Sequence, residues 1–128
     1  MEISEIMTPK PVFIMETDLI ANAKKILIDN TIKHLPVMNK HGQVTGILSD
    51  RDIKLHQAVS DDPNFHATAR VGDAQRRRPY LVSPDTPARQ VLQEMHQRRI
   101  GSAVIVDDDR LVGIFTSVDA CRILAGLI

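Results

Sequence analysis

The sequence predicts an α/β fold made of two copies of one β-α-β-β-α unit, packed about a pseudo-twofold axis. The first observation is an internal repeat, because Ile3 aligns with Val71 at a spacing of 68 residues and Gly46 aligns with Gly113 at a spacing of 67. The second is that both copies show the same order of strand-like and helical hydrophobic patterns. A unit of about 60 residues buries too little surface to be stable alone, so the copies are expected to pack together.

The first copy opens with a short β-rich run at residues 12–14 and continues into a helical stretch whose apolar residues share one face. Those apolar residues are Leu19, Ile20, Ala23, Ile26 and Leu27. Two apolar runs, HLPVM and VTGIL, are joined by a polar turn and predict a β-hairpin. A second helix, from about residue 50 to residue 58, completes the copy.

The second copy repeats this order with a strand at residues 80–82, a less regular helical stretch, and a hairpin formed by AVIV and LVGIF. Its last helix, at about residues 117–127, is apolar on nearly every side and contains Cys121, which we expect to be a small buried residue. One packed face cannot cover so many apolar side chains. We therefore expect a homodimer formed through the terminal helices of the repeats.

These patterns place the first repeat at residues 1–60, a linker at residues 61–69 and the second repeat at residues 70–128. The linker falls in the stretch SDDPNFHATA, whose proline, asparagine and paired aspartates are typical of loops. Together the two repeats form one module.

The composition argues against several classes of function. The 16 Lys and Arg residues balance the 16 Asp and Glu residues, so no net field favours nucleic acid or an anionic membrane. The run QRRRPY is the only dense basic patch. Its arginines could stay solvated, or Arg76, Arg77 or Arg78 could reach a polyphosphate, whereas three arginines would neutralise only a few phosphates of a nucleic acid. No secretion signal or membrane-spanning apolar run is evident. We therefore expect a cytoplasmic protein and give nucleic-acid binding low weight.

No group of residues indicates catalysis or a metal site. The five histidines lack the spacing of metal ligands, and the DDD run at residues 107–109 is explained by a hairpin turn. Cys121 has no obvious neighbouring base. We therefore expect no enzymatic activity, no metal and no resident cofactor.

The motif GILSDRD at residues 46–52 recurs as GIFTSVD at residues 113–119. In each copy a hydroxyl is followed three residues later by an acid, which matches the helix capping box. The same groups at a helix start can instead bind a phosphate and the hydroxyls of a sugar. Glycine inside an apolar strand indicates a bend, or the close approach of another backbone or of a ligand. Both interpretations of the motif stay open at this point.

The whole chain resembles a tandem pair of cystathionine-β-synthase (CBS) domains, also called a Bateman module. The resemblance rests on SEIMTPKPVFI, IKHLPV and GILSDRDI in copy one and on RIGSAVIVD and GIFTSVDA in copy two. It implies a regulatory module that senses an adenosine-containing ligand, such as AMP, ADP, ATP or S-adenosylmethionine, in the clefts between the repeats. We expect any regulated effector protein to be a separate chain.

The resemblance also implies roles for individual residues. Ser49 and Thr116 would contact a phosphate, and Asp52 and Asp119 would contact a ribose. The base pocket would be lined by His34, Leu35, Pro36 and Val12, with Pro79 and Tyr80 as the counterparts in copy two. Two arginines could pair with a phosphate or stay solvated, namely Arg51 and Arg78.

Copy two departs from this pattern. It has Ser102 where copy one has His34, and Val118 where copy one has Arg51. We therefore expect two unequal sites, of which copy one is the better furnished. The competing interpretation is a purely structural dimerisation module whose degenerate clefts bind no ligand.

Overall fold

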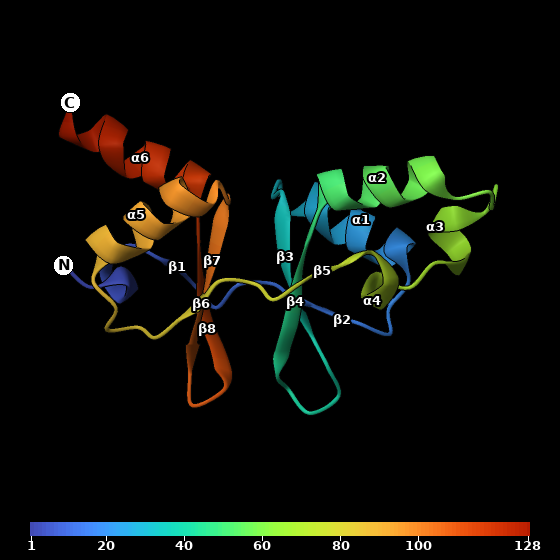
Figure 1. Cartoon of the computed structure of the whole chain (residues 1–128), viewed down its shortest axis with the longest axis horizontal. Coiled ribbons are helices and arrows are strands. Elements are labelled where there is room, and N and C mark those ends of the chain that lie inside the picture. The colour runs from blue at the N-terminus through green and yellow to red at the C-terminus, as the bar shows by residue number, and fades with distance from the viewer. The chain divides into compact units, whose positions relative to one another are not determined.

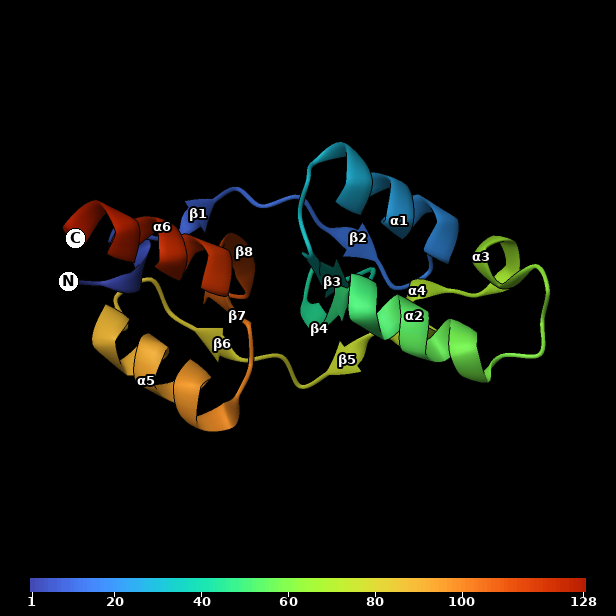
Figure 2. The same cartoon turned by 90° about the horizontal axis from the view of Figure 1, so that it is seen from above.

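The computed structural model describes all 128 residues and divides into two compact units. Unit 2 is the continuous segment Val12–Pro79, whereas unit 1 combines Met1–Pro11 with Tyr80–Ile128. Each unit contains one four-stranded sheet with helices beside it (Figures 1 and 2). The predicted α/β fold with two β-α-β-β-α repeats is therefore confirmed.

Unit 2 has the strand order β2-β3-β4-β5, in which β2 is parallel to β3 and the other pairs are antiparallel. Its strands are β2 (Ile14–Met15), β3 (His34–Met38), β4 (Val44–Ser49) and β5 (Arg76–Arg77). Its helices are α1 (Ile20–Asp29), α2 (Asp50–Val59), α3 (Phe65–Thr68) and α4 (Val71–Ala74). Helices α1 and α2 lie on the same side of the sheet (Figure 1).

Unit 1 has the matching order β1-β8-β7-β6, with β6 parallel to β7. Its strands are β1 (Thr8–Pro9), β6 (Leu81–Val82), β7 (Ser102–Asp107) and β8 (Arg110–Thr116). Its helices are the 3-10 helix η1 (Ile3–Glu5), α5 (Ala88–Arg98) and α6 (Ser117–Leu127). The predicted positions of the second helix in each copy, at about residues 50–58 and 117–127, agree closely with α2 and α6.

The short strands β1 and β5 are exchanged between the repeats. Strand β1 lies near the start of copy one but pairs with β8 of copy two, and β5 lies near the start of copy two but pairs with β4 of copy one. Each incoming strand covers the edge of a hairpin that would otherwise expose unpaired backbone groups. The compact units therefore do not follow the sequence boundaries at residues 60 and 70, because 1–11 joins the second repeat and 70–79 joins the first.

The predicted linker at residues 61–69 is not a simple connection. It contains α3, whose Phe65 is only 7% exposed and belongs to the hydrophobic core of unit 2. The Asp62 carboxylate accepts a 2.8 Å hydrogen bond from the Asn64 backbone N–H and another from the Thr68 hydroxyl. The proline and aspartates that indicated a loop therefore only introduce a short helix, which a buried aromatic ring fixes in place.

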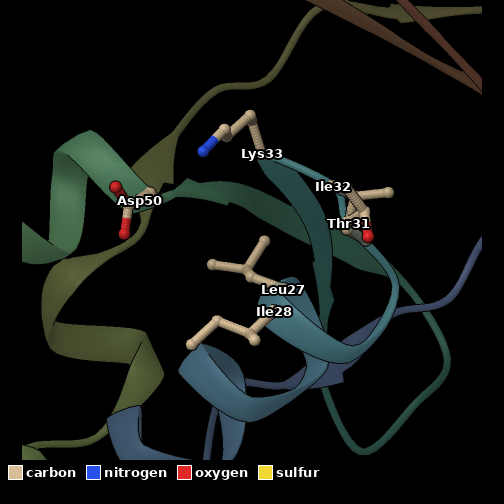
Figure 3. A pocket seen from close by; sticks show the side chains of 6 residues that line it. All are labelled: Leu27, Ile28, Thr31, Ile32, Lys33 and Asp50. Carbon is tan, nitrogen blue, oxygen red and sulfur yellow. The ribbon is translucent and has the colours of Figure 1, made fainter.

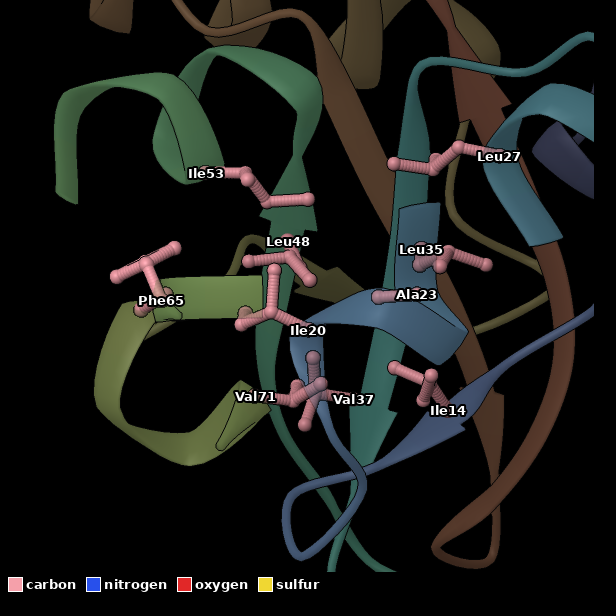
Figure 4. Close-up of a cluster of buried hydrophobic side chains, with 11 residues drawn as sticks. Ile14, Ile20, Ala23, Leu27, Leu35, Val37, Leu48, Ile53, Phe65 and Val71 are labelled. Atoms are coloured by element: carbon pink, nitrogen blue, oxygen red, sulfur yellow. The ribbon is translucent and has the colours of Figure 1, made fainter. Parts of the chain in front are cut away.

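The core of unit 2 lies between its sheet and its helices (Figure 4). Leu35 of β3 lies opposite Leu48 of β4, and both are fully buried with Ile53 of α2. Because strand side chains alternate between faces, the residues next to them lie on the other face of the sheet. These residues are His34, Pro36, Ile47 and Ser49.

Helix α6 has no buried residue, unlike every other helix of the chain. The expectation that Cys121 is buried is therefore wrong, because this thiol lies on an exposed part of α6. The helix nevertheless carries the large apolar side chains Val118, Leu124 and Leu127 in exposed positions. None of the helices combines the length and the hydrophobicity that crossing a membrane requires.

Candidate functional site

Both motif pairs form the capping box. The Ser49 hydroxyl accepts a 3.1 Å hydrogen bond from the Asp52 N–H, and Asp52 Oδ2 accepts a 3.0 Å bond from the Ser49 N–H. In copy two, Thr116 Oγ1 accepts from the Asp119 N–H at 3.5 Å, and Asp119 Oδ2 accepts from the Thr116 N–H at 2.9 Å. The capping interpretation is therefore confirmed in both copies.

Capping occupies only one carboxyl oxygen of each aspartate. The second oxygen, Oδ1, faces a residue of the incoming strand: Asp52 Oδ1 lies 3.9 Å from the Arg76 guanidinium of β5. Asp119 Oδ1 accepts a 3.0 Å hydrogen bond from the Thr8 hydroxyl of β1 and lies 3.6 Å from the Arg122 guanidinium. The caps thus hold each carboxylate in a fixed orientation and leave Oδ1 outside the cap, where Asp119 Oδ1 already accepts a hydrogen bond and Asp52 Oδ1 faces only a guanidinium.

The amides at the helix starts are largely used within the protein. Besides the Ser49 and Asp52 amides in the cap, the Asp50 N–H donates to the Lys33 carbonyl at 3.3 Å. The Ser117 N–H likewise donates to the Gly101 carbonyl at 3.1 Å in copy two. An anion bound at either helix start would therefore need more hydrogen bonds from side chains than an anion bound at a helix N-terminus whose amides are free.

His34 lies directly opposite Ser49 in the β3–β4 register and is half-buried. Burial lowers the pKa of His34 below its usual value, and the positive charge of Arg76 lowers it further, against the opposing effect of Asp52. The imidazole is therefore neutral at pH 7 and can both donate and accept a hydrogen bond. At the equivalent register position in copy two, Ser102 lies opposite Thr116.

The glycines of the motif are explained by the incoming strands. A Cβ at Gly46 would lie 2.8 Å from the Arg76 carbonyl oxygen and would also collide with the buried Gln75 side chain. A Cβ at Gly113 would collide with the Met7 side chain. Of the alternatives that the sequence left open, a bend, a backbone or a ligand, close approach of the β5 segment and of Met7 accounts for these glycines.

The remaining candidate residues are distributed over both units. Val12, Arg51 and Arg78 are exposed, and Arg78 has a left-handed backbone with φ of 58°. The ring of Tyr80 packs against the core of unit 1 with the Arg98 guanidinium 5.0 Å from its centroid, and burial raises its pKa. Pro79 ends unit 2 and Tyr80 begins the second segment of unit 1.

Leu35 does not belong with these residues. Its side chain is fully buried in the core cluster that faces the helices, whereas the half-buried His34 and the fully buried Pro36 lie on the other face of the sheet. A side chain that packs inside the unit cannot also line a ligand site on the opposite sheet face. The assignment of Leu35 to the base pocket is therefore corrected.

Sequence reasoning missed Thr8 entirely and named Arg76 only as one of three arginines of a basic run that could reach a polyphosphate. The signal that could have found them is the repeat itself, because they occupy equivalent positions 68 residues apart. In the structure, both contact Oδ1 of a motif aspartate.

A cavity of about 190 Å³ lies on the helix side of unit 2 (Figure 3). It is lined by Leu27, Ile28, Thr31, Ile32, Lys33 and Asp50. This volume is below the roughly 300–1,000 Å³ that is usual for ligand pockets. None of the predicted site residues lines it, but Asp50 belongs to the motif and lies between Ser49 and Asp52.

The two sheets have matching strand orders, and the helix that follows each hairpin begins with a capping box that contains an aspartate. The chain is therefore a duplicated α/β domain. The sequence model of the CBS domain matches residues 3–58 and again residues 71–126. The chain belongs to the CBS domain family and contains a pair of these domains.

Known proteins with a similar region include complete enzymes and kinase subunits. L-aspartate semialdehyde sulfurtransferase of Methanocaldococcus jannaschii is 30% identical over 97% of this chain, which corresponds to 23% of that protein. The 5′-AMP-activated protein kinase subunit gamma-3 of Bos taurus is 30% identical over 87% of the chain, again 23% of the relative. The chain thus spans about a quarter of these relatives.

Among solved structures, a CBS domain pair crystallised with 5′-methylthioadenosine and S-adenosyl-L-methionine has a TM-score of 0.87 and 29% identity. The alignment covers 100% of this chain and 98% of that one. The similarity therefore extends over the complete pair of repeats.

Proposed function

We propose that this chain is a regulatory module that binds an adenosine-containing ligand at the Ser49–Asp52 motif, with a second site at Thr116–Asp119. The observation that carries the proposal is the carboxylate geometry: each cap fixes one oxygen of the aspartate and leaves Oδ1 beside a polar residue of an incoming strand. A carboxylate held in this way can accept hydrogen bonds from the two hydroxyls of a ribose without reorganising.

The ligand class is supported by the relatives. One similar CBS pair was solved with two adenosine derivatives, and another relative is named as a subunit of an AMP-activated kinase. We extend this class to AMP, ADP, ATP and S-adenosylmethionine. His34, Pro36 and Val12 would contact the base in copy one, with Pro79 and Tyr80 as counterparts. Arg51 and Arg78 would approach a phosphate from solvent.

A regulatory role would require that the ligand alters the relation between the two repeats or between protomers. The strands β1 and β5 make such coupling feasible, because each belongs to the beginning of one repeat and pairs with the sheet of the other. A ligand that changes the position of Thr8 or Arg76 would displace the chain segments that connect the two units. The regulated effector would be a separate chain or a further part of a longer protein.

The test is thermal unfolding with AMP, ADP, ATP, S-adenosylmethionine and NAD. A ligand present at 100 times its Kd stabilises the folded state by about 2.7 kcal/mol, which shifts the midpoint by several degrees. Asp52→Ala and Asp119→Ala, tested singly, should each abolish one site, whereas the exposed control Asp61→Ala should not. If no compound shifts the midpoint, or if both alanine variants bind as wild type and lose only stability, the aspartates are caps and nothing more.

A second candidate function, dimerisation, is favoured by a different observation. Helix α6 exposes Val118, Leu124, Leu127 and Ile128, an apolar set that a second copy of the same helix would cover. Sedimentation should show a dimer that Leu124→Glu converts to a monomer, while Ile28→Glu on the exposed part of α1 leaves it intact. A monomeric wild-type protein would exclude this function.

A further inference from the structure

The copy-one site has a cation where the copy-two site has a hydroxyl. Strand β5 places Arg76 opposite Ile47, and β1 places Thr8 opposite Ile114. Because residues two apart in a strand share a face, Arg76 lies on the same sheet face as Ser49 and Thr8 on the same face as Thr116. The two side chains are therefore equivalent in position and differ in charge.

The Arg76 guanidinium is available to a ligand. It lies 3.9 Å from Asp52 Oδ1, at the limit of an ion pair, and its side chain is 58% exposed. Such an exposed pair contributes little to stability. A guanidinium in this position can turn from the carboxylate to a phosphate and form two parallel hydrogen bonds with it.

The position of Arg76 suits one part of an adenosine ligand. If the ribose hydroxyls bond to Asp52 Oδ1, a phosphate on the same sugar lies within the reach of a side chain that starts beside this oxygen. The helix start offers few free amides, because those of Ser49, Asp50 and Asp52 already have acceptors. Recognition of the phosphate in copy one would therefore depend mainly on this guanidinium.

The copy-two site lacks a cation on its sheet face. Thr8, Ser102 and Thr116 are hydroxyls, and the Thr8 hydroxyl is already bonded to Asp119. Arg122 approaches Asp119 from within α6, at the position where copy one has Leu55, and its side chain is 63% exposed. Val118 stands where copy one has Arg51. This site can bond to hydroxyls of a sugar but offers a phosphate no partner on the sheet.

We propose that Arg76 makes the copy-one site selective for an adenosine ligand that carries a 5′-phosphate, whereas the copy-two site prefers an adenosine ligand without one. This inference rests on the proposed function and goes further in naming the residue that separates the two specificities. One chain would then respond to two different classes of metabolite, one at each site, rather than to the same class at both sites.

The test compares AMP with adenosine by calorimetry, using backgrounds that leave one site. In Asp119→Ala, which keeps the copy-one site, AMP should bind at least about tenfold more tightly than adenosine, since a charged hydrogen bond contributes about 1.5–3 kcal/mol. Adding Arg76→Thr, the copy-two residue, should remove this preference and leave adenosine affinity within about threefold. Arg76→Lys keeps the charge without the fork and should be intermediate.

The matched control is Arg77→Thr, because Arg77 is the next residue of the same strand and its side chain leaves from the opposite face. It should leave the preference unchanged. The reciprocal variant Thr8→Arg, in an Asp52→Ala background, should create a preference for AMP at the copy-two site. Circular dichroism and the unfolding midpoint establish that each variant is folded.

The possible failures are distinct. If neither AMP nor adenosine binds the wild-type protein but another compound of the thermal-unfolding panel does, this inference alone is overturned. If none of the compounds binds, the proposed function fails as well. If both compounds bind but Arg76→Thr weakens the binding of AMP and of adenosine equally, Arg76 only positions Asp52. In that case the inference alone is overturned. The inference would also be overturned if the copy-two site, measured in Asp52→Ala with Thr8 unchanged, preferred AMP over adenosine as strongly as the copy-one site does.

Discussion

The motif regions of the two units share their backbone design and differ in how their aspartates are held. In unit 1, Asp119 Oδ1 accepts a 3.0 Å hydrogen bond from Thr8, so the incoming strand is joined to the helix start. In unit 2, Asp52 Oδ1 has only the distant guanidinium of Arg76, at 3.9 Å. The two copies thus share the cap and differ in the residue that the incoming strand places beside the aspartate.

The difference also separates structural from functional use of the same position. A short hydrogen bond between two elements stabilises the unit, whereas an exposed ion pair contributes little. Thr8 therefore has a structural use that Arg76 lacks. A residue that is not needed for stability is free to select a ligand.

The largest expected difference between the regions concerns the two glycines. Gly46→Ala should lower the free energy of unfolding by about 1–3 kcal/mol, because the new methyl meets the Arg76 carbonyl and the buried Gln75 side chain. Gly113→Ala meets only the Met7 side chain, which can change rotamer, and should cost less than about 1 kcal/mol. Urea unfolding measures both.

Gly126→Ala in α6 is the control, because nothing lies within 4 Å of its added methyl. It should cause no loss of stability, and alanine is the better helix former. Equal losses at Gly46 and Gly113 would show that the incoming strands approach the two sheets equally closely, contrary to the difference described here.

The second expected difference concerns the incoming strands. Thr8→Val removes the hydrogen bond to Asp119 and should destabilise the protein by about 1 kcal/mol. Arg76→Met keeps the apolar stem and should change stability by less than about 0.5 kcal/mol. Thr8→Ser retains the hydroxyl and should recover most of the loss. If Arg76→Met is the more damaging substitution, Arg76 has the structural role and is poorly suited to exchange partners with a ligand.

The sequence was sufficient for the repeats and the motifs because these depend on local patterns. The capping boxes at Ser49 and Thr116 need only a hydroxyl, an acid three residues later and a following helix. Strands β1 and β5 were missed because each has two residues and pairs with a partner far away in the chain. No local periodicity can indicate such a strand.

Two other errors have similar physical causes. Leu35 was assigned to the site because the family resemblance implies a base pocket lined by the HLPV strand, and that resemblance does not tell which side chains of the strand face the helices. Cys121 was expected to be buried because α6 is apolar around its circumference, yet none of its residues is buried in a single chain. Which surface is covered depends on tertiary and quaternary contacts.

The smallest expected difference concerns His34 and its counterpart Ser102. Because burial and Arg76 lower the pKa of His34 in the folded protein, the unfolded chain takes up a proton at a higher pH than the folded one. Stability should therefore be complete above about pH 6.5 and decline as the pH falls below this value. The unfolding midpoint in urea, measured between pH 7.5 and 5.5, should fall less steeply in His34→Ser, the copy-two residue.

His41→Ser is the control, because His41 lies in the exposed β3–β4 turn, outside the cluster of His34, Asp52 and Arg76. Thr8 and Ser102, which stand at the copy-two site where the copy-one site has Arg76 and His34, carry no charge. An unchanged slope in His34→Ser would mean that the decline arises elsewhere. If the pH dependence of stability is lost in His34→Ser and reduced in Arg76→Met, the effect arises in the cluster of His34, Asp52 and Arg76. A phosphate that displaces Arg76 from Asp52 would then favour protonation of the His34 imidazole.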